Sequence, residues 1–419
     1  MLIAACVRIA GLMNKTRRVV VTGLGAVTSI GTNVADFWKA LLEGQCGIRP
    51  FSLFDPSGYR TQTAAQVLDI PDAFLTTFEK KRTSRADRMG LAAAQEAIDQ
   101  SGLDLSREDP TRIGVILGGG TSGLLDSEAY YEQHLRGKKG RPSHVLNHLP
   151  DAITDRIAQR FRVEGLKSTI TTACSSSANA MGFAHDAIAA GLADVVITGG
   201  SDVLARLTYG GFNSLRSVDP EPCRPFDRER RGLSIGEAAG ILVFEEWERA
   251  KRRGAPILAE FLGYGVTSDA YHMTAPDPSG AAGGRTVRSA LAAARVNADD
   301  VDYVNAHGTA TPQNDSAETA ALKAGLGDRA RRIPISSIKS MIGHCLCASG
   351  AIEGVATVLT VREGRIPPTI HYDNPDPACD LDYVPNFARE GSIEVAISDS
   401  FAFGGNSSVV VFAREAGVY

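Results

Sequence analysis

The stretch Gly23-Leu24-Gly25-Ala26-Val27-Thr28-Ser29 decides the fold, because a related stretch occurs far along the chain. The second stretch is Gly263-Tyr264-Gly265-Val266-Thr267-Ser268. Each directly follows a strand-like apolar run, over 17–21 in the first case and over 257–262 in the second. We interpret each Gly-x-Gly as a tight turn. A shared strand, turn and Thr-Ser pair predict an internal duplication.

The two halves continue to match beyond these stretches. An Ala-rich helix is predicted over 91–101 before a strand over 113–117, and a helix over 286–295 precedes a strand over 301–305. A small-residue helix begins at Cys174 and leads to a strand over 194–198, and another runs from about 348 to 361. This alternation predicts the α/β class. We expect halves over 17–256 and 257–419, after an extension over 1–16 that is disordered or follows a misassigned start.

Composition restricts the partners and the compartment. The chain has 419 residues, a net charge of −4 and 43% hydrophobic residues, which does not favour nucleic acid or anionic membranes. No apolar run is long enough to span a bilayer. The seven cysteines have no regular spacing, and the lipobox-like start ending at Cys6 lacks a basic region and an apolar core. Free thiols in a reducing compartment are therefore expected, and we predict a cytoplasmic protein.

The Gly-x-Gly at Gly23 and Gly25 does not indicate a dinucleotide site. The third glycine of that fingerprint is replaced by Thr28, and no acidic residue follows a second strand at the required distance. We therefore expect no cofactor.

Cys174 is the first candidate catalytic residue. Ser and Thr residues surround it and Ala-rich sequence follows, which places it at or near a helix N-terminus. Unpaired N–H groups and the helix dipole stabilise a thiolate there, so its pKa should be low and alkylation fast near neutral pH. The alternative is a buried cysteine that packs as a small hydrophobe.

Two histidine segments favour catalysis. His307 follows a predicted strand, and His344 follows Lys339 by five residues before a predicted helix. Two imidazole N–H donors and a lysine, with no obvious acid behind them, suit the stabilisation of an enolate oxyanion formed by decarboxylation. A structural role is the alternative for any one histidine. His344, Cys345 and Cys347 could also bind a metal, but a second ligand pair at the usual spacing is missing.

Four ordered motifs resemble the β-ketoacyl-acyl-carrier-protein synthases, above all the elongating type and the ketosynthase subunits of type II polyketide systems. The motifs are Ala173-Cys174, His307-Gly308-Thr309, Lys339-Ser340-x-x-Gly343-His344 and Phe401-Ala402-Phe403-Gly404-Gly405-Asn406. The resemblance runs from about residue 17 to residue 412. It implies a thiolase-like fold, with two duplicated α/β halves in five α-β-α-β-α layers, usually as a dimer.

The resemblance also implies an activity, the decarboxylative condensation of an acyl thioester with malonyl-carrier protein in fatty acid or polyketide and polyene synthesis. Cys174 would carry the acyl chain. His307 and His344 would support decarboxylation, and Lys339 would organise the site through Glu318. No catalytic metal is implied.

Other roles carried over from the family concern binding. Thr309 and Thr311 would meet the pantetheine arm, together with Phe401. The backbone N–H groups of Cys174 and Phe403 would form the oxyanion hole, and Phe403 would act as a gate. Thr121 would line the acyl pocket. A structural monovalent cation is expected near Glu353 in some family members.

The expected partners are an acyl carrier protein and a second subunit, in a homodimer or in a heterodimer with a chain-length factor. The predicted carrier-docking residues are basic: Lys80, Lys81, Arg82, Arg85, Arg88 and Arg216. The main alternative is that this chain is itself a chain-length factor, but those lack the cysteine. A thiolase would have a second catalytic cysteine near the C-terminus, where this chain has none. Ala402, Ser177 and Arg231 depart from the family pattern.

Overall fold

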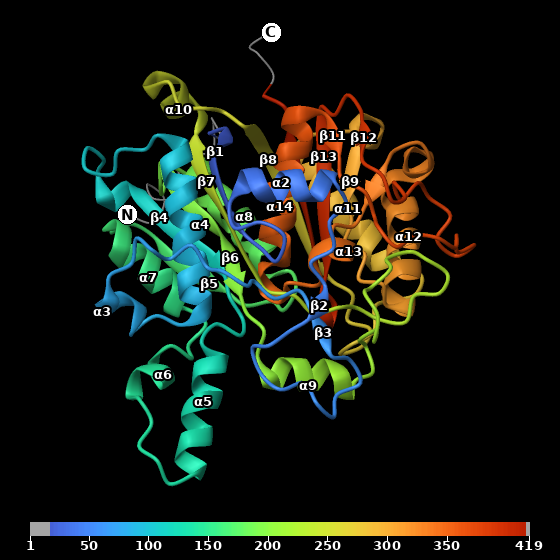
Figure 1. Cartoon of the computed structure of the whole chain (residues 1–419). Coiled ribbons are helices and arrows are strands. Elements are labelled where there is room, and N and C mark those ends of the chain that lie inside the picture. The colour runs from blue at the N-terminus through green and yellow to red at the C-terminus, as the bar shows by residue number, and fades with distance from the viewer. Residues whose placement is uncertain (1–16, 416–419) are drawn as a thin grey trace.

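The computed structural model describes residues 17–415, so the predicted extension over 1–16 lies outside the described residues. Ten strands form one mixed sheet in the order β10-β9-β13-β14-β8-β1-β7-β6-β4-β5. Figure 1 shows helices on both sides of this sheet and between its two halves. The strands of the first half are β1 (Val19–Val27), β4 (Ile113–Gly118), β5 (Lys167–Ile170), β6 (Val195–Asp202) and β7 (Ala238–Glu246). Those of the second half are β8 (Ala259–Ser268), β9 (Tyr303–Asn305), β10 (Ile335–Ser336), β13 (Val395–Phe401) and β14 (Asn406–Ala413).

The strand order confirms the predicted duplication. Read outward from the middle, the first half runs β1-β7-β6-β4-β5 and the second runs β8-β14-β13-β9-β10. The directions match too, because the inner two pairings of each half are antiparallel and the outer two are parallel. A short antiparallel pairing of β1 with β8 joins the halves.

Five layers follow from the way the helices pack. On one outer face, α4 (Arg85–Ser101) and α7 (Ala152–Phe161) cover the first half of the sheet. On the other, α11 (Ala281–Ala294) and α12 (Pro312–Leu326) cover the second half. Between them, α8 (Ser176–Ala189) and α14 (Ser349–Glu363) pack against each other and against both halves (Figure 1). This is the predicted α-β-α-β-α arrangement.

The Gly-x-Gly motifs are not turns, so that interpretation was wrong. Gly23 and Gly25 lie inside β1, and Gly263 and Gly265 lie inside β8. A Cβ on Gly25 would lie 1.8 Å from the backbone oxygen of Ala93 in α4. A Cβ on Gly265 would lie 2.6 Å from backbone atoms of α11. The glycines therefore let one outer helix approach each half of the sheet at backbone distance.

The remaining helices and short strands lie outside the ten-stranded sheet and the helices that form its layers. The helices are α2 (Val34–Leu42), α3 (Thr77–Lys80), α5 (Leu124–Leu135), α6 (Pro142–Leu146), α9 (Arg206–Ser214), α10 (Trp247–Arg253) and α13 (Lys339–Ile342). The short strands are β2 (Arg49–Pro50), β3 (Thr63–Ala64), β11 (Arg365–Ile366) and β12 (Arg389–Glu390). The α5–α6 segment projects from the body of the molecule (Figure 1). Among residues 17–415, no helix has both the length and the apolar character needed to cross a membrane.

Candidate active site

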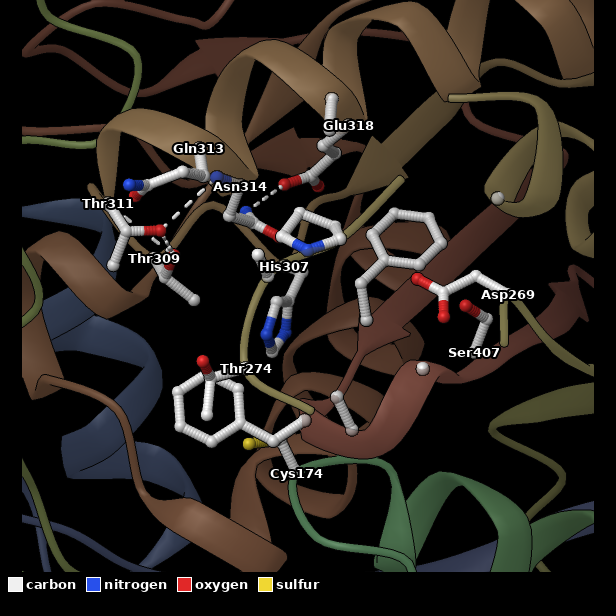
Figure 2. Close-up of a pocket in the computed structure, with 18 of the residues that line it drawn as sticks. Cys174, Asp269, Thr274, His307, Thr309, Thr311, Gln313, Asn314, Glu318 and Ser407 are labelled. Atoms are coloured by element: carbon white, nitrogen blue, oxygen red, sulfur yellow. Dashed lines mark hydrogen bonds between the residues drawn. The ribbon is translucent and has the colours of Figure 1, made fainter. Parts of the chain in front are cut away.

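Cys174, His307 and His344 meet at one end of the layers, as the sequence predicts. Cys174 lies just before α8, His344 lies between α13 and α14, and His307 follows β9. One ligand-type atom from each of the three residues lies within 4.8 Å of the others. The two imidazole rings are nearly perpendicular, with centroids 5.3 Å apart. Figure 2 shows the Cys174 sulfur on the same side of the pocket as the His307 ring.

The segment before α8 positions the thiol. Ala173 has a φ of 53°, in the left-handed region, and its carbonyl accepts hydrogen bonds from the N–H and hydroxyl of Ser176. Such a conformation costs of the order of 1–2 kcal/mol in a residue other than glycine. It turns the chain from β5 into α8 and leaves Cys174 facing the pocket, where its exposed fraction is 8%. The backbone N–H groups of Phe403 and Cys174 both act on the sulfur.

Hydrogen bonds fix the tautomer of His344. Its Nδ1 accepts the N–H of Leu346 at 3.0 Å and lies 3.0 Å from the Ser349 hydroxyl oxygen. An Nδ1 that accepts a backbone N–H carries no proton, so the proton of the neutral ring is on Nε2. Burial, followed by the charge of Lys339, holds the pKa of His344 well below its ordinary value. His344 therefore presents a neutral N–H donor to the pocket.

His307 is also neutral, and its backbone is held by acids. Burial is the main cause that lowers the pKa of His307 well below its ordinary value, with contributions from Lys339 and His344. The His307 backbone N–H donates to Asp399 at 2.6 Å, and that of Gly308 donates to Glu318 at 2.8 Å. Two neutral imidazoles beside a thiol are suited to donating and accepting hydrogen bonds rather than to forming a fixed thiolate–imidazolium pair.

The expected contact between Lys339 and Glu318 is wrong. The Lys339 ammonium forms a buried ion pair with Glu353 of α14, and both side chains are 1% exposed. Glu318 instead accepts N–H groups from Gly308 and from the Asn314 side chain. Lys339 lies in α13 and reaches Glu353 in α14, whereas Glu318 lies in α12. Lys339 still acts on the site. Its charge adds to burial in lowering the pKa values of both histidines, and at Cys174 it opposes the rise in pKa that burial causes.

The pocket around Cys174 contains most of the predicted binding residues. Thr309, Thr311, Phe401 and Phe403 all line it, together with Glu318. The hydroxyl oxygens of Thr309 and Thr311 lie 2.9 Å apart, and Figure 2 shows both beside the N-terminus of α12. The ring of Phe403 lies 5.6 Å from that of Phe212 in α9, and both residues line the pocket. The pantetheine and gating roles stay predictions.

The departures from the family pattern have local explanations. Ala402 has a φ of −101°, so its methyl group causes no backbone strain in this conformation. The Ser177 hydroxyl accepts the N–H of Ala351 at 2.9 Å and thereby links α8 to α14. Arg231 forms an ion pair with Asp219 at 3.1 Å.

Thr121 is bound to a buried acid. It is not among the residues that line the pocket around Cys174 within the described chain. Its hydroxyl and its backbone N–H both bind the buried carboxylate of Asp202. The Asp202 carboxylate also accepts the N–H of Cys347, and it thereby links the loop that carries Thr121 to the segment just before α14. A role of Thr121 in the acyl pocket stays a prediction.

The predicted docking residues fall into two groups in the structure, those paired with acids and those exposed without an ion-pair partner. Arg85 is largely buried and bonded to the carboxylate of Glu237, whose side chain is fully buried, so it is not available to a partner. Lys80 and Arg88 both pair with Asp72, at 2.6 and 3.3 Å. The sequence alone does not reveal these ion pairs, because Asp72 lies outside the helices that carry the basic residues and Glu237 lies 152 residues after Arg85. Lys81, Arg82 and Arg216 are exposed and have no ion-pair partner within residues 17–415.

The geometry of Cys174, His307 and His344 would also permit metal binding by distance alone. The ammonium of Lys339 acts on all three groups, and a nearby positive charge disfavours a second cation. The expectation of no catalytic metal stays a prediction. So does a monovalent cation near Glu353, whose Oε1 is engaged by Lys339.

Sequence reasoning missed the residues that hold the histidines in place. Asp399 binds the backbone of His307, and the N–H of Leu346 fixes the His344 ring. One signal for Asp399 is present in the sequence, since it is the one acidic residue in a strand that otherwise holds apolar residues and serines. A buried thiol, two neutral imidazoles and a pair of N–H groups on a five-layered duplicated fold define a thiol-dependent condensing enzyme of the thiolase-like class.

The comparisons with known proteins agree with this class. The family model for the β-ketoacyl synthase N-terminal domain matches residues 16–250, and that for the C-terminal domain matches residues 258–373. The chain therefore belongs to the β-ketoacyl synthase family.

Its relatives come from two kinds of biosynthesis. It is 39% identical to 3-oxoacyl-acyl-carrier-protein synthase 2 of Coxiella burnetii, covering 95% of this chain and 99% of the relative. It is 42% identical to the putative polyketide beta-ketoacyl synthase 1 of Streptomyces halstedii, covering 94% and 98%. Among solved structures, the ishigamide ketosynthase/chain length factor matches with a TM-score of 0.91 and 35% identity, covering 96% of this chain and 100% of the matched chain.

Proposed function

We propose that this chain catalyses the decarboxylative condensation of an acyl group, carried as a thioester on Cys174, with malonyl-acyl-carrier protein. The observation that carries the proposal is the fixed Nε2–H tautomer of His344 beside a second neutral imidazole and the thiol. Neutral N–H donors suit an enolate oxygen, which needs hydrogen bonds that strengthen as negative charge develops. A catalytically reduced chain-length-factor role is not favoured, because all three groups converge.

In the first step the acyl group moves from its carrier to the enzyme. The Cys174 thiol gives its proton to solvent and attacks the acyl thioester carbonyl. The N–H groups of Cys174 and Phe403 bind the resulting oxyanion, since both act on the sulfur position. The carrier thiolate then leaves and takes up a proton, so the enzyme retains an acyl thioester.

In the second step a carbon–carbon bond breaks and another forms. The malonyl thioester loses CO2, and the electron pair of the broken bond becomes an enolate whose oxygen accepts hydrogen bonds from His344 and His307. The nucleophilic carbon attacks the acyl carbonyl on Cys174. The tetrahedral intermediate expels the Cys174 thiolate, which takes up one proton from solvent through the site. The product is a β-ketoacyl thioester on the carrier.

We also propose that the protein works with a second subunit of the same family, as a homodimer or a heterodimer. β5 lies at the edge of the sheet and pairs only with β4, and an unpaired strand edge favours association. A mainly apolar groove beside it includes Ile170, Phe183, Tyr264 and Val266. The ketosynthase ApeO of Xenorhabdus doucetiae, a structural neighbour with a TM-score of 0.84 and 30% identity over 95% of this chain and 98% of the matched chain, is in complex with its chain length factor.

We propose the cytoplasm as the site of action. The six described cysteines are all free, which is the state expected of thiols in a reducing compartment.

The two steps can be separated by replacing His307. His307→Ala should reduce condensation by on the order of 100- to 1,000-fold, the usual effect of removing one preorganised oxyanion donor. It should leave appreciable acyl loading of Cys174, measured by mass spectrometry. His134→Ala, at an exposed position on α5, is the matched control and should behave as wild type. Condensation by His307→Ala within threefold of wild type would remove His307 from the proposed chemistry.

A further inference from the structure

Two buried acids lie behind the loop that carries His307. Asp399 in β13 is fully buried, and Glu318 in α12 is 1% exposed. Asp399 uses Oδ1 to accept the backbone N–H of His307, and Glu318 uses Oε2 to accept that of Gly308. Two consecutive backbone N–H groups are thus held by two acids from different elements. The loop needs this support, because it leaves the β9 strand and both Gly308 and Ala310 have positive φ.

The second oxygens of the two acids have no donor of their own. Glu318 Oε1 and Asp399 Oδ2 are buried and lack a hydrogen-bond partner within the described residues. The two carboxyl groups nevertheless lie within hydrogen-bonding reach of each other. Two carboxylates at such a separation repel when both are ionised, whereas a single shared proton turns the repulsion into a hydrogen bond.

We propose that Glu318 and Asp399 act as positioning residues, holding one proton between them and so clamping the His307 loop against Cys174. The inference rests on the proposed function, because it assigns to the pair the placement of His307 for decarboxylation. The clamp is closed while the proton is present. Loss of that proton leaves two adjacent buried carboxylates, which move apart and release the loop.

The surrounding charges do not neutralise the pair. Six titratable groups act on one or both of the acids or lie against the loop: Asp315, Lys339, Glu353, Tyr303, Tyr383 and His307. The one cation among them, Lys339, is paired with Glu353, and Asp315 has its own partner in Arg230 at 3.7 Å. Burial raises the pKa values of both Glu318 and Asp399 above their ordinary range. Asp399 raises the pKa of Glu318 further, whereas the hydrogen bond with Glu318 lowers that of Asp399. The shared proton is therefore retained at neutral pH and lost as pH rises.

Amide substitutions test the clamp without removing its hydrogen bonds. In Asp399→Asn, the amide oxygen can still accept the His307 N–H, while the NH2 group donates to the Glu318 carboxylate. Glu318→Gln offers the reciprocal arrangement. In the double variant, two NH2 groups face each other and neither can accept. We predict that Asp399→Leu lowers the condensation rate at least tenfold and that Asp399→Asn restores most of that rate. The relative condensation rate of the double variant, Asp399→Asn with Glu318→Gln, should be lower than the product of the relative rates of the two single variants.

The pH profile separates this role from a merely structural one. The ionisable clamp should make wild-type condensation decline at alkaline pH, and Asp399→Asn should move that decline to higher pH. Infrared difference spectra should show the carbonyl band of one protonated carboxyl group in the wild type at neutral pH, and its loss in Asp399→Asn. Acyl loading of Cys174 serves as the folding control for each variant.

Two results would overturn the clamp. One is an Asp399→Asn variant with the same alkaline decline and the same carboxyl bands as wild type. The other is a double variant whose loss equals the product of the single losses. The failure of the proposed function itself would be recognised separately, because wild-type protein would then load Cys174 without condensing, or would not load it at all.

Discussion

At the scale of single residues, Cys174 combines a nucleophilic sulfur with surroundings that exclude water. Burial raises the pKa of Cys174 to about 11, although the Lys339 charge and the N–H groups of Phe403 and Cys174 act in the opposite direction. The expectation of a low pKa from the helix N-terminus is therefore wrong. The N-terminus of α8 is where it was predicted, but neither neighbouring imidazole carries a charge that could hold a thiolate. The resting group is a thiol, which ionises as the acyl thioester arrives.

The alkylation rate of Cys174 should consequently depend steeply on pH. Between pH 7 and about 10 the iodoacetamide rate should rise nearly tenfold for each pH unit, because only the thiolate reacts and its pKa lies near 11. Peptide mapping in a Cys46→Ser background measures this, since Cys46 is the exposed thiol among the described cysteines. A rate that is already at its plateau at pH 7 would show that the thiolate is the resting form.

The sequence identifies residues that react but not the residues that hold them. Cys174, His307 and His344 stand in recognisable local motifs, and the structure brings them together. The partner of Lys339 was predicted wrongly, because Glu318 and Glu353 lie on different helices and both are near in sequence to site residues. Which acid meets the ammonium depends on how α12 and α14 pack, and a single sequence does not specify that.

At the scale of elements, the duplication explains how the site is assembled. α8 and α14 are equivalent helices, since each lies in the chain between the edge strand of its half and the third strand from that edge. Cys174 precedes the first and His344 precedes the second, so the two N-termini bring them to one place. Close packing makes this possible, because a Cβ on Gly350 of α14 would lie 2.8 Å from the backbone of Ala178 in α8. Periodicity predicted these helices; their mutual approach follows from small residues that only the structure pairs.

The ion pair between Lys339 and Glu353 should stabilise the junction of α13 and α14. Lys339→Met leaves a buried carboxylate unpaired, and breaking a buried pair in this way typically costs about 3–5 kcal/mol of unfolding free energy. The double variant Lys339→Met with Glu353→Gln removes both charges and should recover most of that loss. Denaturant titration measures both. Equal stability of the single variant and the wild type would contradict a structural role for this pair.

At the scale of the whole molecule, charge distribution matters more than net charge. The net charge of −4 would repel an acidic carrier, so docking requires a local basic surface. Arg216 lies next to the pocket-lining Ser217, just beyond α9, and Lys81 and Arg82 follow α3. In Figure 1, α9 and α3 both lie toward the lower side of the molecule. We call these three exposed residues the revised docking set.

Charge reversal should test the revised docking set. Arg216→Glu and Lys81→Glu with Arg82→Glu should raise the Michaelis constant for an acidic carrier protein but not for small pantetheine thioesters. The difference between wild type and these variants in the Michaelis constant for the carrier protein should shrink with added salt. Exposed charges are screened over about 8–10 Å near physiological ionic strength. Arg252→Glu, on the exposed part of α10, is the matched control. An equal loss on both kinds of substrate would indicate damage to the fold instead.

The central claim is that Cys174 carries the acyl chain that condenses with a malonyl unit. Intact-mass spectrometry tests it in one time course, by loading the protein from an acyl-carrier protein and then adding malonyl-carrier protein. The account predicts an acyl adduct on Cys174 that forms first. The adduct should disappear as CO2 is released and a β-ketoacyl-carrier protein, longer by two carbons, appears. An adduct on another cysteine, or one on Cys174 that persists while the β-ketoacyl product forms, would contradict the account.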